Sequence, residues 1–207
     1  MRDYLLSGGT AEWHLLVHLR PSLEPKGKEG LLYPTTKKYA LSDDTIRKRL
    51  ADVLKTKIGR LCVIFDAEAK DAQFRWIRIR SLLVEAGYSS LPEEMDPNGV
   101  VAEADGMPRL GVWIMPDNRS PGMIEDFYLS AIPEDDRELV RARRFVDEIP
   151  VDDRLFEKKT SKATLGVWLA IQSDPIGPGL SIKRGLIRHD AGLLPTFSAW
   201  LDRLFGD

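Results

Sequence analysis

Acidic residues follow two apolar stretches of the sequence in a pattern that suits a metal ion. Asp66 ends the apolar run RLCVIFD, and Glu68 comes two residues later. Asp117 follows the run GVWIM in a similar way. If both runs are strands of a parallel sheet, their carboxyl ends meet at one edge, where the ligands of open α/β sheets gather. Carboxylate oxygens at that edge suit Mg²⁺, which takes one or two of them and keeps several waters.

Two further acids, Glu125 and Asp126, fall near the start of the helix predicted after Asp117. Acids in a first turn are also favoured by the helix dipole, by about 0.3–1 kcal/mol, without any metal. Adjacent residues point about 100° apart on a helix, so one of the pair can face the sheet edge while the other faces solvent. Asp66 and Glu68 have the same alternative, as the cap and first-turn acid of their own helix. Both interpretations stay open from the sequence.

A second constellation is basic. In QFRWIRIR, Arg75 and Arg78 share one face of the predicted helix and are candidates for contact with nucleic-acid phosphates. The alternative is an ordinary surface ion pair, because Asp71 lies four residues before Arg75.

Two other chemical groups favour structural roles. His14 and His18 are four residues apart, but the stretch lacks the glutamate of an H-E-x-x-H zinc motif, so we interpret them as part of a helix face. Cys62 lies inside an apolar run with no histidine at a suggestive spacing, which predicts core packing rather than a nucleophile.

Periodicity, caps and breakers predict the elements that position these residues. Strands are predicted over 3–7, 60–66, 98–104 and 109–115. Helices are predicted over 11–20, 42–57, 69–88, 120–132, 134–149, 160–172 and 195–205, with Ser120 as the cap of the fourth. Residues 21–42 are predicted to be a long loop. The order predicts an α/β fold with a mostly parallel sheet sandwiched by helices, with residues 1–132 as the core and 133–207 as a helical extension packed on it.

The composition excludes several classes of protein to which the chain could belong. The chain has 207 residues, 43% hydrophobic and 30% charged, which is enough to build a core. Its net charge of −2 excludes a basic electrostatic field over the whole protein, but a local basic patch that binds nucleic acid is compatible with it. One cysteine excludes a disulfide framework. No signal pattern is present, and no apolar run approaches the roughly 18 residues of a membrane span. These features predict a cytoplasmic protein.

The order of motifs resembles the Toprim domain of topoisomerases, primases and the overcoming-lysogenization-defect nucleases. The shared order is a strand, a glycine turn and a helix, then a strand ending in Asp-x-acid, then another acid-bearing strand and helix. More narrowly, LGVWIMPDNRSPGMIEDF, SKATLGVWLAIQSDPIGPGLSI and FSAWLDRLF resemble a small prokaryotic family of Toprim-like proteins with no established function. This resemblance covers nearly the whole chain, and WIMPDN…G…EDF is its most specific part.

The resemblance implies a phosphodiester hydrolase that uses Mg²⁺ or Mn²⁺ on DNA or RNA. Toprim enzymes carry Asp-x-Asp after a later strand, which DAE matches with Asp66 and Glu68. Lys162, in the KAT segment, is similar to a basic residue used near phosphate in related nucleases. Asp66, Glu68 and Lys162 are therefore the implied catalytic residues. The implied metal ligands are Asp66, Glu68, Asp117, Glu125 and Asp126.

The first Toprim motif departs from the pattern. Toprim enzymes carry Glu-Gly after the first strand, whereas LLSGG aligns Ser7 with that glutamate. A serine cannot serve as a carboxylate base or ligand, and Glu12 sits within the helix that follows. The alternative function is therefore a non-catalytic module that binds a partner ATPase in a defence-type system.

Overall fold

One mixed sheet forms the centre of the molecule. The computed structural model describes residues 2–7, 11–24, 30–32, 42–56, 58–156 and 159–206. Its strands run in the spatial order β2-β1-β3-β5-β4. β4 pairs antiparallel with β5, and the other three pairings are parallel. The strands are β1 (Arg2–Ser7), β2 (Gly30–Leu32), β3 (Ile58–Asp66), β4 (Val100–Ala102) and β5 (Arg109–Met115).

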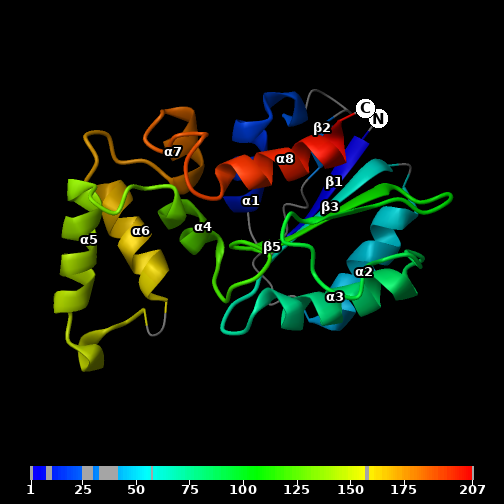
Figure 1. The fold of residues 1–207 in the computed structure, drawn as a ribbon, viewed down its shortest axis with the longest axis horizontal. Coiled ribbons are helices and arrows are strands. Elements are labelled where there is room, and N and C mark those ends of the chain that lie inside the picture. The colour runs from blue at the N-terminus through cyan, green and yellow to red at the C-terminus, as the bar shows by residue number, and fades with distance from the viewer. Residues whose placement is uncertain are drawn as a thin grey trace.

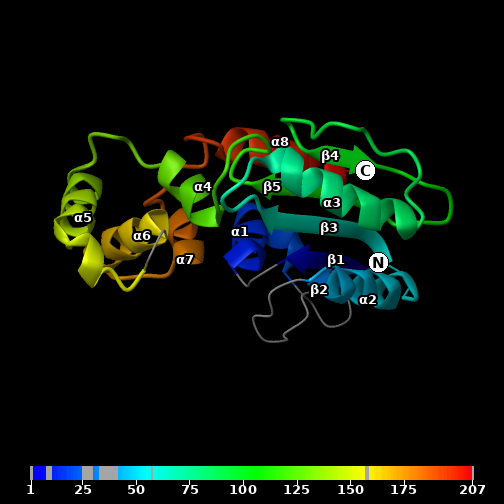
Figure 2. The same ribbon diagram turned by 90° about the horizontal axis from the view of Figure 1, so that it is seen from below.

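Helices cover both faces of this sheet (Figure 1). The α-helices are α1 (Ala11–Leu19), α2 (Asp43–Leu54), α3 (Ala72–Glu85), α4 (Ile124–Ser130), α5 (Arg137–Glu148), α6 (Thr160–Ala170), α7 (Pro178–Lys183) and α8 (Leu194–Phe205). Two short 3₁₀ turns, η1 (Pro21–Leu23) and η2 (Val151–Asp153), join them. α2 and α3 lie on one face, and α1 and α8 lie on the other (Figure 2). The predicted α/β class, with its mostly parallel sheet between helices and its helical C-terminal part, is confirmed.

The alternation of side chains along β1, β3 and β5 divides the core between the two faces. Leu6, Val63 and Val112 belong to the cluster under α2 and α3. Leu5 and Cys62 belong to the opposite cluster, which also contains residues of α1, α4 and α8. β3 is the middle strand and is buried on both sides, as expected for a continuous apolar run in a parallel sheet.

The C-terminal helices join the second of these clusters. α8 packs on the sheet through Trp200, whose ring lies 5.5 Å from that of Trp113 and whose indole N–H donates to the carbonyl of Val100 at 3.0 Å. α5, α6 and α7 lie beside the sheet rather than over it (Figures 1 and 2). Leu139 of α5 and Trp168 of α6 are nevertheless part of the same apolar cluster. One core therefore runs through residues before and after position 132.

Three helices begin at a polar side chain that caps them. The side chains of Ser42 and Asp71 accept backbone N–H bonds at the starts of α2 and α3, and Asp136 does the same for α5. The predicted start at Ser120 is wrong, because α4 begins at Ile124. The backbone of Gly122 instead exchanges two 2.8 Å hydrogen bonds with Glu68, which holds the chain extended just before the helix.

The stretch predicted as a long loop contains regular structure, and one further helix was not predicted. The span 21–42 includes η1 and the short strand β2, whose three residues add to the edge of β1. The breaker-rich stretch 174–179 leads into α7, which starts with Pro178 at its first position. The glycine turn at residues 8–10 and much of the span 21–42 lie outside the described residues.

Within the described ranges, no helix is both long and apolar enough to span a bilayer.

Candidate functional site

Asp66 is the central carboxylate of the candidate site. It ends β3 opposite Met115 of β5, at the carboxyl edge of the parallel strands. Its side-chain Oδ1 accepts a 3.0 Å hydrogen bond from the backbone N–H of Ile124, the first residue of α4. Its own carbonyl accepts a 2.9 Å bond from Nε of Arg75 on α3. Asp66 is thus held by Ile124 of α4 and Arg75 of α3, and it lies at the sheet edge where the sequence pattern placed it.

The Asp66 carboxyl has an unusual proton affinity. Burial, with a further contribution from the negative charge of Glu125, raises its pKa from 3.8 to about 6. The negative charge of Glu68 also raises this pKa, by less. The Ile124 N–H bond and the charge of Arg75 oppose the rise but do not cancel it. Glu125 and Glu68 therefore both lie near enough to repel the negative charge of Asp66.

Glu125 is the acid of α4 that faces this site. Its side chain is mostly buried, and its carboxylate lies 3.5 Å from the ammonium group of Lys162 at the start of α6. Lys162 is more than half exposed, so it can turn toward a ligand without leaving the edge of the site. The structure thus connects Lys162 to Asp66 through Glu125, which sequence spacing alone did not show.

Asp126 turns back toward its own helix. One of its oxygens accepts a 2.7 Å bond from the backbone N–H of Met123, which caps α4, and the other accepts a bond from the hydroxyl of Ser161. The sequence left open which of Glu125 and Asp126 faces the sheet edge. Glu125 does, whereas Asp126 joins α4 to α6.

Asp117 also has a local role. Its carboxylate accepts bonds from the backbone N–H groups of Arg119 and Ser120 and from the hydroxyl of Ser120, at 2.7–3.0 Å. The next residue, Asn118, is buried and bonds the backbone of Ile114 and Pro97. The two side chains shape the loop between β5 and α4. Neither oxygen of Asp117 needs a metal to be satisfied.

Glu68 and its neighbouring arginines are engaged in ion pairs. Glu68 has a left-handed backbone, with φ of 63°, and its carboxylate lies 3.1 Å from Nη2 of Arg75. Arg78 pairs with Asp43 of α2. Both arginines predicted to contact phosphate therefore have protein partners here, which a ligand would have to displace.

The described residues hold no cluster of three or more Asp, Glu, His or Cys side chains arranged for a metal ion. Asp66, Glu68 and Asp117 accordingly do not form a preassembled metal site. Asp66 and Glu125 remain as a pair, which fits Mg²⁺ or Mn²⁺ because such ions use one or two carboxylates and several waters. A cation between them would also relieve the repulsion by Glu125, which adds to the effect of burial in raising the Asp66 pKa.

Two residues near the site were not predicted. Glu12 of α1 is only 4% exposed, and Tyr128 of α4 is 1% exposed. Burial, together with the charges of Glu12 and Glu125, raises the pKa of the Tyr128 hydroxyl. Glu12 comes shortly after Ser7, which is buried at the end of β1. A lone acid inside AEWHLLVH was the available signal for a buried carboxylate.

The groups assigned structural roles behave as predicted. Cys62 is fully buried in the middle of β3, where burial raises the pKa of its thiol. His14 and His18 stack on one face of α1 with ring centroids 6.2 Å apart, and Gly179 of α7 packs against His14.

Comparison with known protein families gives one match. Residues 14–206 match the model of a family described as "protein of unknown function (DUF3226)", so the chain belongs to this family. No curated protein and no solved structure matches the chain.

Proposed function

We propose that this member of the DUF3226 family binds Mg²⁺ or Mn²⁺ at Asp66 and Glu125 and hydrolyses phosphodiester bonds of nucleic acid. One observation carries the proposal: two mostly buried carboxylates from different elements converge at the carboxyl edge of β3, where burial and the charge of Glu125 raise the pKa of Asp66. Such convergence is expected where a cation completes a site. We place the activity in the cytoplasm, since the single cysteine offers no disulfide.

The bound cation would polarise the phosphate, lower the pKa of an attacking water and stabilise the leaving oxygen. Asp66 and Glu125 would hold it, with Asp66 oriented by the Ile124 N–H group. Lys162 would leave Glu125 once that carboxylate binds the ion and would offset negative charge on the phosphate. Glu68 would join the ligand set by releasing Arg75, which then becomes available to a second phosphate oxygen.

The test combines metal binding with cleavage. Calorimetry with Mn²⁺ should show one site in the wild type and a loss of about tenfold or more in affinity for Asp66→Asn. Nicking of supercoiled DNA and cutting of an RNA oligonucleotide should fall in parallel. Asp105→Asn, which changes an exposed acid on the turn between β4 and β5, is the matched control. Equal activity in wild type and Asp66→Asn, or no Mn²⁺ binding by the wild type, would sink the proposal.

A second candidate is a non-catalytic module that binds a partner ATPase, the partner implied by the Toprim-like resemblance. It is favoured by an exposed apolar row on α3, where Phe74 is 52% exposed and Ile77 is 59% exposed, with Val84 further along. Contiguous exposed apolar patches are features of protein interaction sites. Ser7, in place of a glutamate, points the same way.

Two variants distinguish the two candidate functions. If the protein is a partner module, Ile77→Asp should abolish co-purification with an ATPase encoded beside it, whereas Asp66→Asn should leave co-purification intact. If it is a nuclease alone, Ile77→Asp should keep its Mn²⁺-dependent cleavage and no ATPase should co-purify with the wild type.

A further inference from the structure

The hydroxyl of Tyr128 on α4 is a buried donor that the fold does not use. Tyr128 is only 1% exposed, and within the described residues its hydroxyl oxygen has no hydrogen-bond partner. Tyr88 is equally buried but shows the usual arrangement, since its hydroxyl donates at 2.9 Å to the carbonyl of Pro108. A buried hydroxyl without a partner costs free energy, which a hydrogen bond to a nearby acceptor would recover.

The nearest candidate acceptor on the same helix is Glu125. It precedes Tyr128 by three positions, so the two side chains are neighbours on one side of α4. Side chains of a helix lean toward its N-terminus, which directs the Tyr128 ring over the turn that carries Glu125. The electrostatics agree with this placement, because burial and the charges of Glu12 and Glu125 together raise the pKa of the Tyr128 hydroxyl. The hydroxyl is therefore a neutral donor within reach of a carboxylate of the proposed site.

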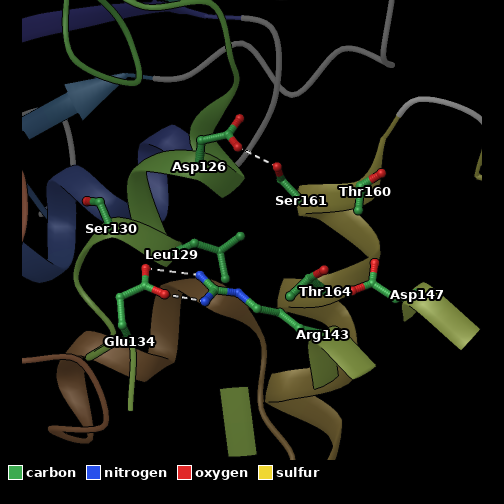
Figure 3. A pocket seen from close by; sticks show the side chains of 9 residues that line it. All are labelled: Asp126, Leu129, Ser130, Glu134, Arg143, Asp147, Thr160, Ser161 and Thr164. Carbon is green, nitrogen blue, oxygen red and sulfur yellow. Dashed lines mark hydrogen bonds and ion pairs between the residues drawn. The ribbon is translucent and has the colours of Figure 1, made fainter. Parts of the chain in front are cut away.

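Glu125 has a partner that can be replaced. Its carboxylate lies 3.5 Å from the ammonium group of Lys162, whose side chain is more than half exposed. An ion pair with an exposed member at this separation is weak. Beside it, the hydrogen bond between Ser161 of α6 and Asp126 of α4 joins the starts of the two helices (Figure 3). Glu125 can therefore change partner by a side-chain movement while the helices stay in place.

We infer that Tyr128 is a positioning residue, whose hydroxyl donates a hydrogen bond to Glu125 when that carboxylate leaves Lys162. The inference rests on the proposed cation site, because binding of the cation is the event that separates Glu125 from Lys162. Carboxylates that ligate metals are normally held by hydrogen bonds of this kind. The bond favours the ionised carboxylate and fixes one of its oxygens, which leaves the other to the ion. It also satisfies the buried hydroxyl, so cation binding and hydrogen bonding favour each other.

Tyr128→Phe removes the hydroxyl alone and separates this role from a structural one. Without divalent cations, its urea-unfolding midpoint should equal or exceed that of the wild type, because no hydrogen bond is lost. Its Mn²⁺ affinity, measured by calorimetry, should fall by about tenfold. Tyr88→Phe is the matched control and should show the reverse, with a lower midpoint from the lost bond to Pro108 and unchanged Mn²⁺ affinity. A lower midpoint for Tyr128→Phe, or wild-type Mn²⁺ affinity in that variant, would overturn the inference.

A second measurement decides the role of Tyr128 even if the wild type binds no Mn²⁺, the result that would end the proposed function. Lys162→Met removes the partner of Glu125 without any cation, so the Tyr128 hydroxyl should then become its partner. Tyr128→Phe should therefore lower the urea midpoint in the Lys162→Met protein, although it does not do so in the wild type. This coupling should disappear when Glu125→Gln is added, which identifies Glu125 as the shared partner. Additive effects of Tyr128→Phe and Lys162→Met would overturn the inference, whatever the result with Mn²⁺.

Discussion

The side-chain Oδ1 of Asp66 accepts a 3.0 Å hydrogen bond from the backbone N–H of Ile124, 58 positions further along the chain. This bond joins the end of the central strand to the start of α4. It also brings Glu125, the next residue, beside a carboxylate that is already costly to ionise. The edge of the sheet is consequently acidic, and we expect it to respond to both protons and cations.

The free energy of unfolding should depend on pH through Asp66. Its pKa is raised to about 6 in the folded protein, above the ordinary 3.8 of the unfolded chain. The folded state therefore binds the proton more tightly, and this contribution is fully present below pH 3.8 and lost as pH rises through 6. Between pH 4 and 7, Asp66→Asn should gain about 2 kcal/mol relative to the wild type. Urea unfolding of both proteins across that range measures it; parallel curves would contradict it.

Divalent cations should stabilise the wild type at pH 7. An ion that binds only the folded state adds about 2.7 kcal/mol at a concentration of 100 times its Kd. Mn²⁺ should therefore raise the wild-type Tm, and it should also lower the pKa of Asp66 by favouring its ionised form. Thermal unfolding of wild type, Glu125→Gln and Asp105→Asn with and without Mn²⁺ checks this. A Tm gain in Glu125→Gln as large as in the wild type would exclude Glu125 as a ligand.

Asp126 should matter for stability rather than for metal affinity. Asp126→Ala removes the bond to the Met123 N–H group and the bond from Ser161, so we expect a loss of about 2 kcal/mol in the free energy of unfolding. Ser161→Ala should lose about half as much, because the cap remains. Chemical denaturation gives both values. If Asp126→Ala unfolds like the wild type but loses Mn²⁺ binding, the assignment of Glu125 and Asp126 is reversed.

Replacing Gly111 or Gly166 by alanine should change the stability in opposite directions, because only Gly111 is tightly packed. A Cβ on Gly111 of β5 would lie 2.4 Å from Cδ2 of Leu204, so Gly111→Ala should push α8 away and cost about 1–3 kcal/mol. A Cβ on Gly166 of α6 would meet nothing within 4 Å. Gly166→Ala should therefore stabilise the protein by about 0.5–1 kcal/mol, since alanine is the better helix former. Thermal unfolding compares the two; a destabilised Gly166→Ala variant would contradict the packing.

The sequence predicted the position of Asp66, because that position depends only on where a strand ends. A buried apolar run followed by Asp66 was sufficient to place that carboxylate at the sheet edge, because parallel strands share their carboxyl edge. The different roles of Glu125 and Asp126 were not predictable. Both are acids near one helix start, and their orientation depends on where Ser161 and Lys162 of a distant helix come to lie.

The start of α4 was misjudged for a related reason. Ser120 and Pro121 form a common start signal, but local propensity was outweighed by the backbone pairing of Gly122 with Glu68. That pairing is a contact between segments more than fifty positions apart, so no local rule contains it. β2 was missed because three residues inside a breaker-rich span carry too little periodicity to distinguish a strand from a loop.

Because α8 is made late in synthesis, its packing on the sheet affects how the chain folds as it is made. The sheet face that carries Leu5, Cys62 and Trp113 is made early in synthesis, whereas Phe197 and Trp200, which cover it, are made much later. A nascent chain that has produced the described strands has α1 on that face but still lacks Phe197 and Trp200, so part of the apolar face stays exposed to other chains. Any shortened product ending before α8 would present the same surface, and quality-control proteases and chaperones would recognise it. We therefore expect this face to be fully covered only once α8 has been synthesised.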